Sequence, residues 1–230
     1  ADATGKAEAA RLKEWKNLRN KGVWYDTEVR EWDDVVKEAK LKSEPVHFGY
    51  LHGLMVLKNS ELPEDDPNRK YKYRVVFLGD RVRTQHFEQA LFNNGGSSPA
   101  TIEAARCCDA YGCLPGHDIE QADAEQAYIQ ADMIGAETWI VLPEEGRPTG
   151  WQDMPGWGTY RRPVVRMRKA LYGHPDAGTF WEKHCDDRVR AAGYVPIGQD
   201  WPSCYFHPVS YTHLTLPTNP NVKKTLYPVQ

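Results

Sequence analysis

The sequence has few cysteines, and they are not arranged to hold a metal ion. Its five cysteines include no CxxC pair, and no cluster of histidines completes a zinc-binding pattern. An odd number of cysteines without a disulfide framework indicates reduced thiols, which are typical of an intracellular compartment. A structural zinc site and a disulfide-stapled secreted fold are therefore not expected.

Long apolar runs and an excess of positive charge are also lacking. No apolar run is long enough to span a bilayer, so we expect no membrane partner. The net charge is -3, whereas a dedicated nucleic-acid-binding protein is usually basic. Any contact with nucleic acid therefore requires locally clustered cations. There is no initiator Met either, and the start at Ala1 is expected to lie inside a longer product.

The composition is that of a folded protein. Hydrophobic residues make up 40% and charged residues 27% of 230 positions, which suits one large domain or two small ones. Predicted helices and strands interleave without a regular alternation, which favours an α+β fold over a doubly wound sheet. Helices are expected over residues 6–19, 33–41, 101–110, 124–131 and 180–192. Strands are expected over residues 46–57, 71–78, 114–123, 139–142, 164–167 and 204–206.

Two segments carry clustered positive charge. The strands 46–57 and 71–78 form a predicted hairpin, and its second strand is basic at Lys72 and Arg74. A second basic run contains Arg166, Arg168 and Lys169, of which the two arginines share one face of a strand. One interpretation of this run is a track along a phosphate backbone, and the other is a solvated sheet edge.

Asp123 stands at the predicted junction between the strand 114–123 and the helix 124–131. A carboxylate at that position is held rigidly and can face a cleft. Mg²⁺ is a hard cation that prefers such oxygen ligands, and phosphoryl transfer commonly uses it. The alternative is that Asp123 only caps the following helix.

The order of the sequence motifs resembles that of the copia-type reverse transcriptases, which LTR retrotransposons encode within a Pol polyprotein. Asp123 is followed by an Ala-Tyr-Ile run, and Leu171-Tyr172-Gly173 is followed by Trp181. Upstream, Lys72 to Val76 looks like the basic fingers strand of that family. Three further segments match in the same order, namely residues 139–146, 193–194 and 200–206. The resemblance runs from about residue 6 to residue 208.

The resemblance implies a fold and an activity. Residues 1–208 would form the fingers and part of the palm of a right-hand polymerase. The intact parent would be an RNA-directed DNA polymerase, a nucleotidyltransferase that adds dNTPs to an RNA or DNA template–primer. Two Mg²⁺ or Mn²⁺ ions would assist this reaction. Its implied partners are the integrase and RNase H domains of the polyprotein, and its implied location is a cytoplasmic virus-like particle or the nucleus.

The resemblance also implies roles for four residues. Asp123 would be the first catalytic aspartate and a ligand of both metal ions. Tyr128 would lie under the sugar of the incoming nucleotide, with a core aromatic as the alternative. Lys72 and Arg74 would lie near the triphosphate, with a solvated hairpin face as the alternative.

Two departures from the family pattern bear on activity. The family motif usually continues Leu-Lys-Gln after Leu-Tyr-Gly, but here His174-Pro175-Asp176 follows, and an Asp would add negative charge close to phosphates. The aromatic-x-Asp-Asp motif expected after Phe206 is missing, and Asp186-Asp187 lies inside a predicted helix. We therefore expect the chain to be truncated before that motif and inactive alone.

The last residues and two other functions complete the expectations. Residues 209–230 resemble translated adapter sequence, with a disordered natural tail as the alternative, so they are left out of the predicted fold.

A second function is a non-catalytic nucleic-acid-binding remnant of a decayed element. A third is an unrelated metal-dependent hydrolase, which would need a second carboxylate facing Asp123 that the sequence does not show.

Overall fold

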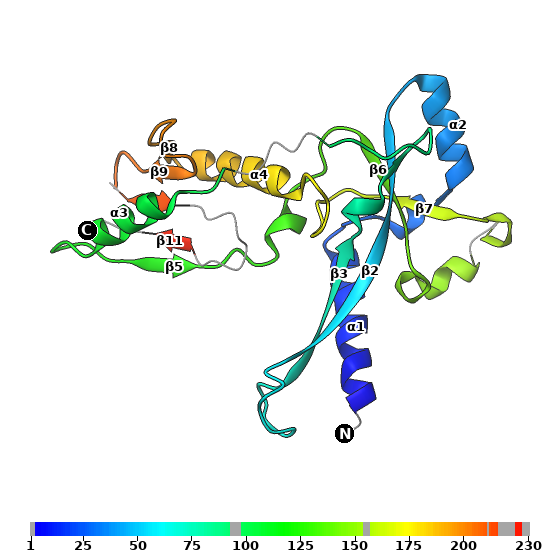
Figure 1. The fold of residues 1–230 in the computed structure, drawn as a ribbon, viewed down its shortest axis with the longest axis horizontal. Coiled ribbons are helices and arrows are strands. Elements are labelled where there is room, and N and C mark those ends of the chain that lie inside the picture. The colour runs from blue at the N-terminus through cyan, green and yellow to red at the C-terminus, as the bar shows by residue number, and fades with distance from the viewer. Residues whose placement is uncertain (1–2, 93–97, 154–156, 211, 216–223, 227–230) are drawn as a thin grey trace. The chain divides into compact units, whose positions relative to one another are not determined.

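A computed structural model describes residues 3–92, 98–153, 157–210, 212–215 and 224–226. The chain divides into two compact units, and each is described by itself (Figure 1). Unit 1 comprises Ala1–Phe92 and Asp132–Pro175, and unit 2 comprises Asn93–Ala131 and Asp176–Gln230. Both units combine helices with a β-sheet, so the protein is of mixed α/β class. Among the described residues, no helix has the length and hydropathy needed to cross a membrane.

Unit 1 is built on a mixed sheet of strand order β1-β7-β6-β2-β3, with β4 paired to β2. Its strands are β1 (Arg30–Glu31), β2 (Val46–Lys58), β3 (Lys70–Phe77), β4 (Arg83–Thr84), β6 (Glu137–Val141) and β7 (Pro163–Arg166). β2 runs parallel to β6 and antiparallel to β3. The predicted hairpin is confirmed, and its register runs from Lys58 opposite Lys70 to Leu51 opposite Phe77.

The core of unit 1 lies where helix α2 (Trp32–Lys42) covers the sheet. Val35, Val36 and Ala39 are buried because they recur at helical spacing on one face. Trp32 stacks on Phe48 of β2 with ring centroids 4.0 Å apart. The same cluster includes Val46, Trp139 and Val164. The predicted helix over residues 33–41 is confirmed.

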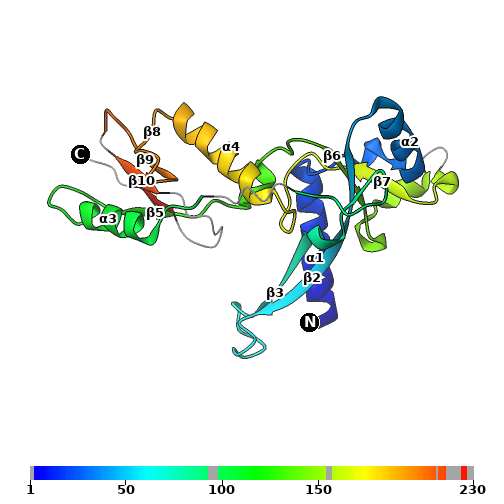
Figure 2. The same cartoon turned by 45° about the horizontal axis from the view of Figure 1, so that its top comes forward.

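Helix α1 (Ala3–Asn20) lies along the β2–β3 hairpin and packs against β3 (Figures 1 and 2). Trp15 and Leu18 are buried, and Trp15 makes an edge contact with Trp24 at 6.1 Å between ring centroids. Leu12 is 56% exposed, because it lies about 120° around the helix axis from Leu18.

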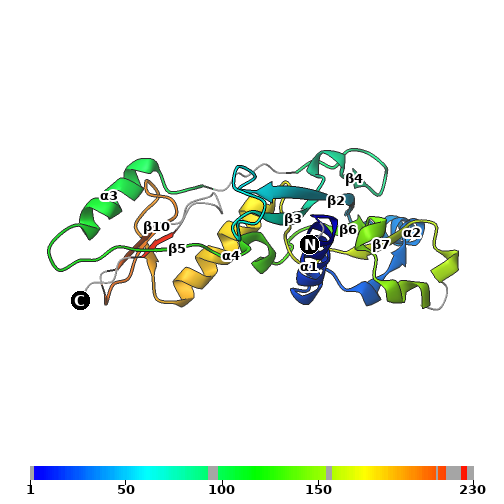
Figure 3. The same cartoon turned by 90° about the horizontal axis from the view of Figure 1, so that it is seen from below.

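Unit 2 is a five-stranded antiparallel sheet between two helices. Its strand order is β5-β11-β10-β9-β8, with β5 (Glu120–Ala122), β8 (Val195–Pro196), β9 (Cys204–Phe206), β10 (His213–Thr215) and β11 (Lys224–Leu226). Tyr205 and Leu214 pack on helix α4 (Ala177–Ala191). His213, next to Leu214, contacts Tyr111 of helix α3 (Ile102–Gly112) at 4.7 Å. Because neighbouring residues alternate faces, the two helices cover opposite faces (Figure 3).

Two expected elements of unit 2 do not form as predicted. The strand 114–123 is reduced to β5, because Pro115 and Gly116, with a φ of 82°, make a turn. The helix 124–131 is reduced to the 3₁₀ turn η3 (Ala127–Gln130), because Gln126 has a left-handed φ of 52°. Helix α3 begins after Thr101, whose side chain accepts the Ala104 N–H at 3.1 Å.

The segment 209–230 was left out of the predicted fold, yet it contains two strands. β10 pairs with β9, and β11 pairs with both β10 and β5. The origin of this segment stays a prediction.

The Leu171-Tyr172-Gly173 motif forms a turn that holds the end of β3. The Phe77 N–H donates to the Tyr172 carbonyl oxygen at 2.8 Å. Gly173 has a φ of 93°, and a Cβ at this position would collide with the Phe77 carbonyl oxygen. The next residue, His174, is buried, with its ring centroid 5.0 Å from that of Phe77 and 5.3 Å from that of Phe92. The motif is therefore a structural clamp on the hairpin.

Replacing Gly173 should test this clamp. Gly173→Ala should lower the free energy of unfolding by about 3 kcal/mol, because the substitution adds both backbone strain and a collision with Phe77. Gly150→Ala is the matched control in the same unit, because a Cβ there meets no atom within 4 Å. The control should change the free energy of unfolding by less than about 0.5 kcal/mol in urea titrations. Equal effects of the two variants would contradict the clamp.

His174 should make unit 1 less stable in acid. Burial, and then the nearby His47, lower the pKa of His174 to about 4 from its ordinary 6.5. Below pH 6.5 His174 therefore becomes protonated in the unfolded chain, whereas in the folded chain it stays neutral until about pH 4. Between pH 7 and pH 5 this effect should remove about 2 kcal/mol from the free energy of unfolding. His174→Leu should lose that part of the pH dependence in denaturant titrations, and an unchanged pH dependence would show that His174 is not its source.

Candidate functional site

The predicted site residues are divided between the two units. Asp123 and Tyr128 belong to unit 2. The five predicted cationic residues all belong to unit 1, namely Lys72, Arg74, Arg166, Arg168 and Lys169. A single site that combines the two groups stays a prediction.

Asp123 directly follows β5 and is exposed. The neighbouring Ala122 pairs with Lys224 of β11. The capping alternative is wrong, because no helix begins at Ala124 and the 3₁₀ turn η3 has Gln126 at its N-cap. The carboxylate thus stands at the end of a short strand, and its role as a metal ligand stays a prediction.

A two-metal centre needs more carboxylates than Asp123. Across the described ranges, no group of three Asp, Glu, His or Cys side chains could hold a metal ion. Residues 209–230 supply β11, which pairs with β5, and β10, which pairs with β11, and their sequence contains no Asp or Glu. The described residues therefore do not provide the ligands for a pair of Mg²⁺ or Mn²⁺ ions.

Tyr128 lies in η3, five positions after Asp123. Its neighbours Ala127 and Ile129 are buried, Tyr128 is half-buried, and η3 packs against α4. The helix that was expected to carry the ring back over Asp123 does not form. Contact between Tyr128 and a nucleotide sugar therefore stays a prediction, and so does the core-packing alternative.

Lys72 and Arg74 lie on an exposed, positively charged face of the β2–β3 hairpin. They are opposite Val56 and Leu54 of β2, and Lys70 is opposite Lys58. Cross-strand partners share a face, so we define the basic hairpin face by its six side chains, Leu54, Val56, Lys58, Lys70, Lys72 and Arg74. The alternate residues of β3, which are Tyr73, Val75 and Phe77, are buried instead.

The cations of the basic hairpin face are crowded enough to affect one another. Partial burial lowers the pKa of Lys72, and the charges of Arg74 and Lys58 lower it further. On α1, burial raises the pKa of Glu14, against the opposing effect of Lys72 and Arg74. A bound anion would relieve this repulsion among the cations.

The second basic run is already engaged with acidic side chains. Arg166 forms an ion pair with Glu137 at 3.0 Å and Arg168 with Glu28 at 3.4 Å. Lys169 forms one at 2.6 Å with an aspartate, Asp132. Partly exposed pairs of this kind contribute little free energy, so a phosphate could exchange with them. The track along a phosphate backbone stays a prediction.

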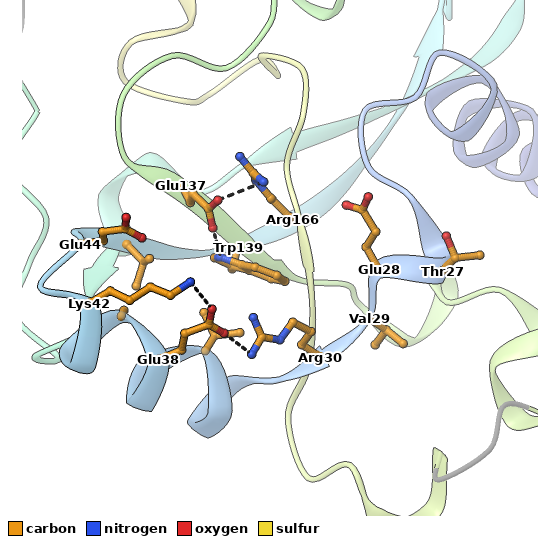
Figure 4. Close-up of a pocket in the computed structure, with 13 residues that line it drawn as sticks. Thr27, Glu28, Val29, Arg30, Glu38, Lys42, Glu44, Glu137, Trp139 and Arg166 are labelled. Atoms are coloured by element: carbon orange, nitrogen blue, oxygen red, sulfur yellow. Dashed lines mark hydrogen bonds and ion pairs between the residues drawn. The ribbon is translucent and has the colours of Figure 1, made fainter.

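Unit 1 also contains a pocket that the sequence analysis missed (Figure 4). It has a volume of about 450 Å³ and lies among α2, β1, β6 and β7. The charged residues that line it are Glu28, Arg30, Glu38, Lys42, Glu44, Glu137 and Arg166. The spacing of Glu38 and Lys42, four positions apart on one helix, was the only local signal. The other members come from distant segments, which sequence spacing does not connect.

Comparison of the chain with protein-family models, with curated proteins and with solved structures gives no match. The functional assignment therefore rests on the order of the sequence motifs and on the geometry of the described residues. Of the predicted site residues, Lys72 and Arg74 lie together on the basic hairpin face. That surface is the strongest candidate for a functional site.

Proposed function

We propose that the chain is a fragment of a copia-type RNA-directed DNA polymerase, with parts of its fingers and palm. By itself, the chain binds nucleic acid but does not extend a primer. The order of the motifs supports the family, and the basic hairpin face supports the binding. In the intact parent, the ligands would be a template–primer and a dNTP.

The single observation that carries this proposal is the composition of the basic hairpin face. Four cations project from it, and no acidic residue of β2 or β3 shares it. The chain is acidic overall, so this segregation of positive charge is a local property. Lysine and arginine side chains that neutralise phosphates supply affinity independent of sequence. Leu54 and Val56 lie between the cations and are exposed, so they can contact sugars or bases.

A non-catalytic remnant of a decayed element is the second candidate. It is supported by His174, which stands at the motif position of a family Leu and fills a core between Phe77 and Phe92. Both candidates predict binding by the basic hairpin face. They differ in the DNA beyond the codon of Pro208, where a functional element would encode an Asp-Asp hairpin. Reading that genomic sequence distinguishes them.

The purified 230-residue chain should not extend a primer. Asp123 is a single carboxylate where the mechanism needs several, so dNTP addition on poly(rA)/oligo(dT) should stay at the level of a no-protein control. The measurement is primer extension with Mg²⁺ and, separately, with Mn²⁺. Robust extension that depends on the template would overturn this part of the proposal.

Removing cations from the basic hairpin face should weaken binding. The triple variant Lys70→Gln, Lys72→Gln and Arg74→Gln should raise the Kd for a single-stranded oligonucleotide at low salt about tenfold to a hundredfold. The slope of log K against log salt should become shallower by about 2, because a variant that neutralises fewer phosphates releases fewer counterions on binding. Fluorescence anisotropy at several salt concentrations measures both quantities.

The matched control removes the same charge elsewhere in unit 1. Lys21, Lys37 and Lys40 are exposed and lie off the basic hairpin face. Their triple change to Gln should leave the Kd within about threefold and the salt slope nearly unchanged, since long-range effects of exposed charges are screened. If the control weakens binding as much as the hairpin variant, only the net charge matters and the proposed surface is wrong.

A further inference from the structure

The pocket of unit 1 holds charges of both signs around an apolar floor. Arg30 forms an ion pair with Glu38 at 2.6 Å, and Arg166 forms one with Glu137 at 3.0 Å. Arg30 also lies over the Trp139 ring, 5.6 Å from its centroid. Figure 4 shows both arginines on one side of Glu28, with Trp139 between them. Both signs of charge are therefore within reach of one small ligand.

The arginines can accept an anionic group without losing their present partners. A guanidinium has five N–H donors, and Arg30 and Arg166 each reach their acidic partner through one terminal nitrogen. The planar fork of arginine matches a carboxylate in two-point contacts. Their side chains are 39% and 43% exposed, so these donors are accessible. The space beside Trp139 is therefore suited to a carboxylate.

Glu28 is the acid best placed for a cationic group. Its ion pair with Arg168, at 3.4 Å, is longer than those of Glu38 and Glu137. An ammonium group that approached Glu28 would therefore displace only a weak contact. In Figure 4 Glu28 lies on the other side of the two arginines from Glu38 and Glu137, so this carboxylate and both arginines border the same part of the pocket.

The floor of the pocket suits a short aliphatic body. Val29, Val35, Ala39 and Val46 line it and are buried to 8% exposure or less, as is Trp139. Its volume of about 450 Å³ lies in the lower part of the range for small-molecule sites. The donors of the two arginines, the carboxylate of Glu28 and the apolar side chains beneath them together suit a zwitterion.

We propose that this pocket binds a small zwitterion with an aliphatic body, of the amino-acid or dipeptide class. The ligand carboxylate contacts Arg30 and Arg166, and its ammonium group contacts Glu28. Its aliphatic part lies on Val29 and Trp139. This site is independent of the basic hairpin face and of the polymerase assignment.

Three probes separate the two charges in a direct binding test on the whole chain. They are glycyl-leucine, its N-acetyl form without the ammonium group, and its C-terminal amide without the carboxylate. Binding is followed by the NMR shift of the Trp139 indole N–H, which is identified by its loss in Trp139→Phe. Glycyl-leucine should bind about tenfold more tightly than either single-charged probe. Equal affinity of all three probes, or no saturable shift up to about 10 mM, would overturn the proposal.

Variants assign each charge to its residue. Glu28→Gln should remove the advantage of glycyl-leucine over its N-acetyl form, and Arg30→Gln should remove its advantage over the amide. Arg190→Gln is the matched control, because Arg190 forms an equivalent exposed ion pair with Asp186 but belongs to unit 2. The control should leave all three affinities unchanged. If it weakened glycyl-leucine binding as much as Arg30→Gln, the pocket would not be the site.

Discussion

The antiparallel register of β2 and β3 is the constraint on which the basic hairpin face depends. It places Tyr73, Val75 and Phe77 in the core and turns Lys72 and Arg74 outward. A slip of one residue would exchange the two faces, burying the cations and exposing the aromatic side chains. Both ends of the hairpin resist such a slip. The Asn59 side chain donates to the Asn68 carbonyl oxygen at 3.0 Å, and Tyr172 accepts the Phe77 N–H.

The same clamp accounts for the unusual continuation of the Leu-Tyr-Gly motif. His174 packs its ring between Phe77 and Phe92, so its position serves the core rather than a ligand. The Asp176 carbonyl oxygen accepts the Phe180 N–H at the start of α4, so its backbone has a structural role. The motif thus has a role in folding that persists whether or not a catalytic centre is complete.

Binding and catalysis have different requirements in this chain. Affinity for an anionic polymer needs only cations on one exposed face, which β2 and β3 supply within a single hairpin. Phosphoryl transfer needs several carboxylates converging within a few ångströms, and among the described residues no three Asp, Glu, His or Cys side chains are grouped to hold a metal ion. A fragment can therefore retain the first property without the second. The pocket lined by Arg30 and Glu28 is a third feature, with chemistry unrelated to either.

The sequence by itself determined the elements whose pattern is local. The buried stripe of α2, the two strands of the hairpin and helix α4 before Gly193 follow from periodicity and from terminating residues. Only the tertiary structure decided the rest. The left-handed backbone of Gln126 interrupts the expected helix over residues 124–131. The sequence did not reveal this, because the composition of a segment does not show the backbone conformation of one residue. Strand register places Lys58 on the basic hairpin face, opposite Lys70. Arg30 and Arg166 line the same pocket because contacts between distant segments depend on how the whole chain packs.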